Sequence, residues 1–216
     1  YNFFFKYNKK YLTNAHRFYY VSYKKYDDLE SNFVSESKYQ FSKNDVIDYI
    51  KDYIPNYRLG WYYQQLLKLY SFRANITSKE FILIFDSDIL LLKPLLLFDN
   101  DNPILYKRNT GNKKIHKPYK ISMEYILPEL KGLSNDSGIC HLMLFKKDLL
   151  EDLLIKIEKY YKKEAWKVCL DSVIYYIKNY NYNESMLSEY ELYYAYIKKY
   201  KYYKIDTNLK YSDISL

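Results

Sequence analysis

The fold is decided by the stretch Phe81-Ile82-Leu83-Ile84-Phe85-Asp86-Ser87-Asp88-Ile89-Leu90. Its five leading residues are aromatic or aliphatic, and they run without interruption into Asp-Ser-Asp. An uninterrupted apolar run of this kind predicts a strand that is buried on both faces, as in parallel or mixed sheets covered by helices. In such sheets, ligands bind beyond the carboxyl ends of the strands. We therefore expect the functional site at Asp86, Ser87 and Asp88.

Two carboxylates stand at this end of the strand, separated by the small side chain of Ser87. Because side chains alternate between the faces of a strand, Asp86 and Asp88 are expected to point the same way. Two like charges held close together require a cation or a proton to relieve their repulsion. Mg²⁺ and Mn²⁺ prefer carboxylate oxygens, so the pair predicts a divalent metal site. The alternative is a pair of turn aspartates, because Asp is a common turn residue.

The length of 216 residues predicts a single domain over residues 1–216. Hydrophobic residues make up 49 % of the chain, which excludes an intrinsically disordered protein. No apolar run approaches the roughly 20 residues that span a bilayer, and no secretory signal opens the chain. We therefore expect a soluble, cytoplasmic domain without a membrane span. The formal net charge of +8 favours anionic partners such as nucleotides, although the lysines are spread as on an ordinary solvated surface.

Apolar and turn patterns along the chain predict strands that alternate with helices. The strands are expected at 18–23, 81–85, 104–106 and 139–145, and the helices at 45–53, 58–70, 119–131, 147–163, 165–178 and 188–199. Residues 27–40 are predicted to form a loop and residues 200–216 a peripheral tail. This alternation favours an α/β domain of three layers, in which helices flank a mostly parallel central sheet.

An amphipathic helix is predicted by Arg58-Leu59-Gly60-Trp61-Tyr62-Tyr63-Gln64-Gln65-Leu66-Leu67-Lys68-Leu69-Tyr70. Arg58 stands at its start, where backbone amides favour phosphate and an arginine adds a bidentate donor. Gln64 and Gln65 face either a ligand or solvent. The alternative is an ordinary core helix with a polar edge.

Further polar residues stand beside the predicted strand at 139–145 and in the last helix. Asn135 and Asp136 precede that strand, whose only polar residue is His141. A single histidine in an apolar strand is most often a core residue, and the other interpretation is a metal ligand or an acceptor contact. Ser188-Glu189-Tyr190-Glu191 opens the helix with two carboxylates that helical spacing turns to different sides. The alternative interpretation is that both glutamates are solvated residues at the start of a helix, where the helix dipole favours acidic side chains.

Four sequence boxes together resemble glycosyltransferases of the GT-A superfold, the nucleotide-diphospho-sugar transferases. The resemblance is greatest to a little-characterised bacterial and viral family, and it covers about residues 15–200. The boxes are Arg58–Leu69, Asp86–Asp88, His141–Phe145 and Ser188–Tyr193. An Asp-x-Asp box by itself is weakly specific, whereas four boxes in this order are much more so.

The resemblance implies a Rossmann-like GT-A domain that transfers a sugar from a UDP- or GDP-sugar donor with Mn²⁺ or Mg²⁺. It implies that Asp88 binds the metal directly and that Asp86 reaches the ribose or the metal. His141 is a further candidate, as a metal ligand or an acceptor contact. Glu189 would act as general base on an acceptor hydroxyl, and Asp136 would hold hydroxyls of the donor sugar. The acceptor, a glycan, lipid or protein, is left open. The residues implied in nucleotide-sugar binding are Arg58, Gln64, Gln65, Asp86, Ser87 and Asn135.

The chain departs from the GT-A pattern at its beginning. GT-A domains normally open with an apolar strand and a loop that binds the nucleotide base. Here the first clear strand lies at 18–23, so this unit is expected to be truncated or missing. Some GT-A families also carry a metal-binding motif with a histidine late in the chain. This motif is not evident here, since the chain has only His16, His116 and His141.

Two other functions compete with this interpretation. A phosphatase of the haloacid-dehalogenase type also uses an apolar strand that ends in Asp-x-Asp, with the first Asp as nucleophile. It requires a later strand ending in Gly-Asp or Asp-Asp, and none follows residue 103. A basic, aromatic domain that stacks single-stranded nucleic acid is the other alternative. The 31 Tyr and four Gly are better explained by AT-rich codons, so no nucleic-acid partner is expected.

Overall fold

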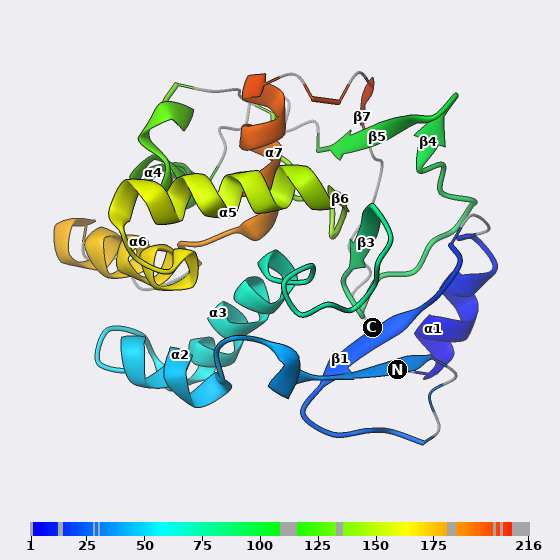
Figure 1. Cartoon of the computed structure of the whole chain (residues 1–216), viewed down its shortest axis with the longest axis horizontal. Coiled ribbons are helices and arrows are strands. Elements are labelled where there is room, and N and C mark those ends of the chain that lie inside the picture. Colours follow the sequence, from blue (N-terminus) through cyan, green and yellow to red (C-terminus); the bar gives the residue numbers. More distant parts are fainter. Residues whose placement is uncertain are drawn as a thin grey trace.

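The computed structural model describes residues 2–12, 15–27, 29, 31–108, 116–132, 136–180, 185–200, 202–203 and 205–208. Helices predominate among the described residues, and the strands are short (Figure 1). The helices are α1 (Asn2–Lys9), α2 (Lys43–Ile50), α3 (Asn56–Leu69), α4 (Lys117–Ile126), α5 (Lys147–Tyr161), α6 (Ala165–Tyr180) and α7 (Glu189–Tyr200), with 3₁₀ turns at Glu36–Lys38 and Pro128–Leu130. The strands are β1 (Tyr19–Ser22), β2 (Asn32–Ser35), β3 (Phe81–Phe85), β4 (Phe98–Asp99), β5 (Asn102–Lys107), β6 (Leu142–Lys146) and β7 (Ile205–Asn208).

The predicted helices are confirmed, because their signals are local, except that the helix expected at 119–131 ends at Ile126 and a 3₁₀ turn follows at Pro128–Leu130. At the start of α2, Ser42 and Asp45 form the reciprocal capping box, in which each side chain bonds the other residue's backbone amide. The apolar stripe of α5 is buried along its length, as its helical spacing requires. The stripe consists of Leu149, Leu150, Leu153, Leu154 and Ile157.

The predicted three-layer domain with a mostly parallel central sheet is wrong. The described strands form three small sheets, β1–β2, β3–β6 and β4–β5–β7, and no extended sheet joins them. Two of the four pairings are parallel, β1–β2 and β5–β7, whereas β3 pairs antiparallel with β6 and β4 with β5. The predicted loop at 27–40 contains β2, and the predicted tail contains β7. The strand that precedes Asp86 therefore belongs to a two-stranded antiparallel ribbon.

The apolar run of β3 explains the wrong prediction. Such a run signals burial, but it carries no information about the direction or number of the paired strands. All five residues of β3 are half-buried, because β6 covers one edge and the other side borders a hollow.

Helix α7 occupies the centre of the core. Every residue from Glu189 to Ile197 is buried, including both glutamates of its first turn. Figure 1 shows α4, α5 and α6 gathered on one side of the molecule, with α1 and β1 on the opposite side. A helix that is buried all round at the middle of a domain brings its N-terminal side chains into the interior. Within the described residues, no helix is long and apolar enough to cross a membrane.

Candidate functional site

Four elements meet where β3 ends. The antiparallel register pairs Phe85 with Leu142, so the next residue, Asp86, lies beside His141. The backbone amide of Asp86 donates to the His141 carbonyl at 3.0 Å. The last turns of α3 bring Gln65 and Lys68 to the same place, and the first turn of α7 brings Glu189 and Tyr190. We call Gln65, Lys68, Asp86, His141, Glu189 and Tyr190 the Lys68 cluster.

Asp86 is the best-bonded carboxylate of the Lys68 cluster. Its Oδ1 accepts from Lys68 Nζ at 2.6 Å and from the Tyr190 hydroxyl at 2.9 Å. Its Oδ2 lies 3.3 Å from His141 Nδ1. Burial pushes the pKa of Asp86 upward, but these three neighbours outweigh burial and hold it below its ordinary value. Asp86 is therefore an ionised, fixed carboxylate at neutral pH.

Lys68 joins Asp86 to a second carboxylate, that of Glu189. Lys68 Nζ lies 2.9 Å from Glu189 Oε1, and the ammonium also sits over the Tyr190 ring at 4.6 Å from its centroid. Glu189 is only 1 % exposed, and the Gln65 amide donates to it. Burial would lower the pKa of Lys68, but the two carboxylates outweigh burial and raise it. Burial raises the pKa of Glu189, and Lys68 offsets only part of that effect.

The second glutamate of the α7 start holds a different segment. The Glu191 carboxylate accepts from the Ser137 hydroxyl and, at 3.0 Å, from the Gly138 amide. Glu191 is 4 % exposed, and burial raises its pKa although both donors oppose this. Glu189 and Glu191 thus point to different partners, as helical spacing predicts. The alternative of a solvated acidic helix start is wrong, because both carboxylates are buried.

Asp88 and Ser87 lie outside the Lys68 cluster and are exposed. The alternation of side chains along a strand ends with β3 at Phe85, and a turn follows. Asp86 consequently turns inward while Asp88 stays at the surface. Within the described part of the chain, the Asp88 side chain has no hydrogen bond or ion pair. Asp88 is nevertheless close enough to the cluster to act on Tyr190 electrostatically. The pKa of Tyr190 is raised chiefly by burial, and the charges of Glu189, Asp86 and Asp88 raise it further.

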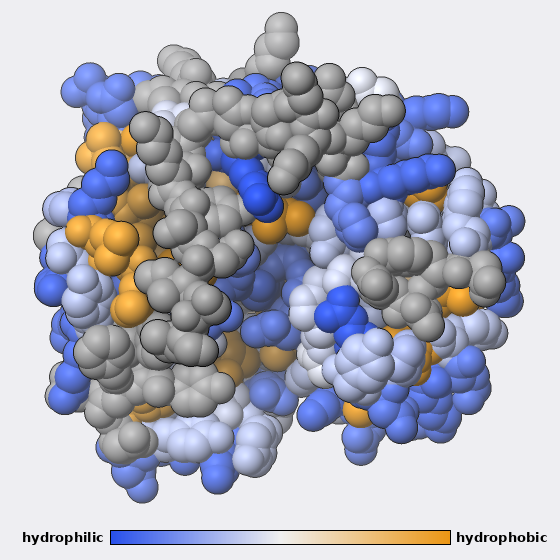
Figure 2. Space-filling view, turned by 180° about the vertical axis from the view of Figure 1, so that it is seen from behind, coloured by the Kyte–Doolittle hydropathy of each residue, from blue (hydrophilic) through white to orange (hydrophobic). Residues whose placement is uncertain are grey.

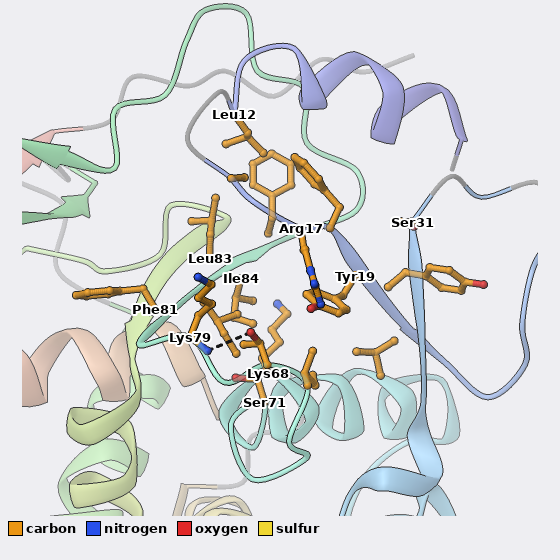
Figure 3. A pocket seen from close by; sticks show the side chains of 18 of the residues that line it. Leu12, Arg17, Tyr19, Ser31, Lys68, Ser71, Lys79, Phe81, Leu83 and Ile84 are labelled. Atoms are coloured by element: carbon orange, nitrogen blue, oxygen red, sulfur yellow. Dashed lines mark hydrogen bonds between the residues drawn. The ribbon is translucent and has the colours of Figure 1, made fainter.

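A hollow of about 1390 Å³ adjoins this end of β3. Its polar lining includes Gln64, Lys68, Asp86 and Ser87, and much of the rest is apolar. Figure 3 shows Lys68 and Ser71 on the α3 side, Phe81, Leu83 and Ile84 on the β3 side, and Arg17 and Tyr19 on the β1 side. The face seen in Figure 2 is hollowed near its centre, with hydrophilic and hydrophobic side chains around the depression.

Arg58 lies in the first turn of α3 and contacts the segment that leads into α7. Its guanidinium donates to the Ser185 hydroxyl and stacks on Trp61 at 5.1 Å. His116 Nε2 lies 3.2 Å from the carbonyl oxygen of the same Ser185. The structure thus groups Arg58 with His116, and Arg58 does not line the hollow.

The remaining predicted residues lie apart from the Lys68 cluster. Asp136 accepts from Lys107 Nζ at 2.9 Å, and about a third of its side chain is exposed. Its neighbours Ser137 and Gly138 are the donors to Glu191, so Asp136 is tied to α7 through them. Asn135 lies outside the described residues. Among the described residues, no group of three or more His, Cys, Asp or Glu side chains is arranged to hold a metal ion.

Sequence reasoning missed Lys68 and Tyr190, although a signal for Lys68 was present. Arg58, Trp61, Gln65 and Lys68 follow one another at spacings of three, four and three residues, which places them on one face of α3. Of these residues, Gln65 and Lys68 reach the Lys68 cluster, whereas Arg58 contacts Ser185. Helical spacing from Gln65 is therefore the signal that could have found Lys68.

His141 shows backbone strain at the site, and two substitutions can measure it. Its φ is 61°, a left-handed conformation that costs L-residues about 1–2 kcal/mol. We expect His141→Gly to be about 1 kcal/mol more stable than His141→Ala, since both lose the Asp86 contact and only Gly loses the strain. At ordinary positions Gly is the less stable of the two. Urea denaturation of both variants checks this, and an Ala variant as stable as the Gly variant would exclude the strain.

Comparison with known proteins identifies one family. The model of a family of unknown function, DUF6492, matches residues 12–213. No curated protein and no solved structure matches the chain.

Proposed function

We propose that this chain, which belongs to the DUF6492 family, is a metal-dependent glycosyltransferase that uses a nucleoside-diphosphate sugar. The observation that carries the proposal is the Lys68 cluster: a buried ammonium between Asp86 and Glu189, at the rim of a large hollow, with Asp88 exposed beside it. Buried charges are expensive unless they serve a purpose, and such clusters are typical of functional sites. A core built only for stability would use apolar side chains here.

The charges of the site favour a metal-bound diphosphate over a free anion. One ammonium faces two carboxylates in the Lys68 cluster, and Asp88 adds a third carboxylate outside it. A free diphosphate would be repelled by this surplus of negative charge. A divalent cation held by Asp88 would offset this repulsion and make diphosphate binding favourable.

The residues present fit a cation that arrives with its substrate. Mg²⁺ is commonly held by one or two carboxylates together with substrate phosphates, so a group of three protein ligands is not required. Asp88 supplies an exposed carboxylate, and Asp86 Oδ2 has one long contact, to His141 at 3.3 Å, which leaves it room for another partner. When bound, the cation would stabilise the charge that develops on the departing diphosphate.

The hollow offers further groups for a nucleotide. Arg17 and Lys79 place positive charges in its lining, and Tyr19 contributes a ring on which a base can stack (Figure 3). Gln64 and Ser87 also line the hollow, as Asp86 does, and supply hydrogen-bonding groups. These residues support donor binding in the hollow, whereas Arg58 contacts the segment before α7.

Glu189 has a clear structural task, and its role as general base stays a prediction. A general base must come within hydrogen-bond reach of the acceptor hydroxyl. Glu189 is 1 % exposed, and Lys68 and Gln65 occupy its carboxylate. Its contacts support the task of holding Lys68 against Asp86. Catalysis by Glu189 would require the Lys68 contact to open, and the role of Asp136 in holding donor hydroxyls is likewise untested.

The proposal predicts metal-dependent stabilisation by a nucleoside diphosphate. With UDP- or GDP-sugar at about 100 times Kd in the presence of Mn²⁺, we expect the free energy of unfolding to rise by about 2.7 kcal/mol. The isosteric variant Asp88→Asn should lose this gain, because it removes the carboxylate that meets the cation. The matched control is Asp52→Asn, which changes an exposed carboxylate in the turn after α2 and should keep the full gain.

Thermal unfolding with a panel of nucleoside-diphosphate sugars, with and without Mn²⁺, is the measurement. No gain with any nucleotide, or an equal gain without metal, would contradict the proposal. Stabilisation by Mg²⁺ with a phosphate analogue alone would favour the phosphatase alternative.

A further inference from the structure

The side chain of Asn8 ties α1 to the segment that follows Asp88. Asn8 Nδ2 donates to the Ile89 carbonyl at 2.6 Å, and Asn8 Oδ1 accepts from the Leu91 amide at 2.7 Å. Asn8 is 6 % exposed although it lies in an N-terminal helix of eight residues. A third bond, from the Leu95 amide to the Tyr11 carbonyl at 3.1 Å, continues the contact. Figure 3 shows α1 and Leu12 at one end of the hollow.

These bonds complete the anchoring of the turn that carries Asp88. On its amino side, the Asp86 amide is bonded to the His141 carbonyl, and the Ile89 amide donates to the Asp86 carbonyl at 3.3 Å. On its carboxyl side, Asn8 holds both Ile89 and Leu91. Asp88 itself makes no side-chain bond within the described part of the chain. The position of its carboxylate therefore depends on the backbone, and Asn8 fixes that backbone.

We propose that Asn8 is a positioning residue that holds the Asp88 carboxylate where it meets a cation bound to a diphosphate. This role rests on the proposed function of Asp88. A loop that is ordered before its ligand arrives binds more tightly, because binding does not have to order it. An amide side chain can accept from one backbone amide and donate to a carbonyl two residues away, so an asparagine satisfies both of these backbone groups at this buried place. Helix α1 is in this way part of the site.

Two variants test the role of Asn8. Asn8→Asp keeps the shape and the acceptor for Leu91, but it puts a carboxylate oxygen against the Ile89 carbonyl; Asn8→Ala removes both bonds. The matched control is Asn102→Ala, since the Asn102 amide also holds the carbonyls of a turn, at Asp99 and Asn100 between β4 and β5. The control loses two side-chain bonds to a turn at an exposed place away from the hollow, so it shows what the loss of such a turn contact does elsewhere in the chain.

The first measurement is hydrogen exchange of the Leu91 amide, which needs no ligand. We expect its exchange to be faster in Asn8→Ala, with the core of α7 unchanged, and to stay slow in Asn102→Ala. Unchanged exchange at Leu91 in Asn8→Ala would overturn the anchoring itself. This readout stands whether or not the protein is a transferase.

The second measurement is the binding of Mn²⁺ together with inorganic pyrophosphate. Binding is monitored by the relaxation rate of water protons, which changes when the protein binds Mn²⁺. We expect both Asn8 variants to bind about tenfold more weakly, as is typical when residues supporting a metal ligand are removed. Equal binding by the variants, with Leu91 exchange accelerated, would overturn the positioning role and leave the proposed function intact. Absence of binding by the unmodified protein would overturn the function and the positioning role together.

Discussion

Gly138→Ala is expected to destabilise the protein by about 3 kcal/mol, at the upper end of the usual cost of overpacking. A Cβ at Gly138 would lie 2.3 Å from Tyr194 Cβ, 2.7 Å from Tyr194 Cγ and 2.9 Å from the Tyr190 carbonyl oxygen. These atoms belong to the base of a side chain and to the backbone of α7, so no flexible group can move aside. The segment must retreat instead, which also stretches the bond from the Gly138 amide to Glu191.

Gly60→Ala is the matched control for this prediction. Gly60 lies inside α3, and nothing stands within 4 Å of a Cβ added there. Alanine favours the helix over glycine by about 0.5–1 kcal/mol, so this variant should be more stable than the unmodified protein. Urea denaturation of both variants measures the difference. If the free energy of unfolding of Gly138→Ala lay within 1 kcal/mol of the value for the unmodified protein, the tight contact between this segment and α7 would be excluded.

Lys68→Met is expected to cost about 3–5 kcal/mol of stability near pH 7, as is typical when one partner of a buried ion pair is removed. The ammonium is the common partner of Asp86 and Glu189, whose side chains are 19 % and 1 % exposed. Without Lys68, two carboxylates remain close together in a poorly solvated place. Methionine fills a similar volume, so the loss reflects charge and not an empty cavity.

The pH dependence separates the charge effect from a packing defect. Burial raises the pKa of Glu189, and removal of Lys68 should raise it further. A carboxyl whose pKa is raised on folding favours the folded state when it is protonated, and the benefit is lost as the pH rises through its folded value. The difference in free energy of unfolding between Lys68→Met and the unmodified protein should therefore become smaller as the pH falls from 7 toward 5. A packing defect would leave this difference constant.

The stability contributed by Asp86 and by Lys68 depends on pH only outside the range from pH 5 to pH 7. The pKa of Asp86 is lowered, so its contribution to stability is present above its ordinary value of 3.8 and is lost as the pH falls through its folded value. The pKa of Lys68 is raised, so its contribution is present below 10.5 and is lost at higher pH. Neither Asp86 nor Lys68 changes its charge between pH 5 and pH 7, so neither causes the expected decrease in the difference between Lys68→Met and the unmodified protein.

A double variant and an exposed lysine serve as controls for Lys68→Met. Lys68→Met with Glu189→Gln removes both members of the buried pair, and it should recover a large part of the lost stability. Lys131→Met, at an exposed turn, should stay within about 0.5 kcal/mol of the unmodified protein. Urea denaturation between pH 5 and pH 7 measures all three. A double variant no more stable than Lys68→Met alone would contradict the paired arrangement.

The sequence by itself determined the helices, the strand that ends at Phe85 and most of the residues around the candidate site. These features depend on local rules: helical periodicity for α3 and α5, the Ser42–Asp45 cap for α2, and an apolar run for β3. Each rule operates among residues a few positions apart, so it can be read without the rest of the chain. The assignment of a transferase function from the same boxes stays a prediction.

Only the tertiary structure decided how the strands pair and what the polar residues touch. The antiparallel pairing of β3 with β6 replaced the expected parallel sheet, because an apolar run does not specify its partner. The Asp86 contact with Tyr190 joins residues 104 positions apart, and the Asn8 contact with Leu91 joins residues 83 apart. Burial and pKa arise from such distant contacts, so the acidic start of α7 looks like a solvated surface in the sequence and is part of the core in the fold.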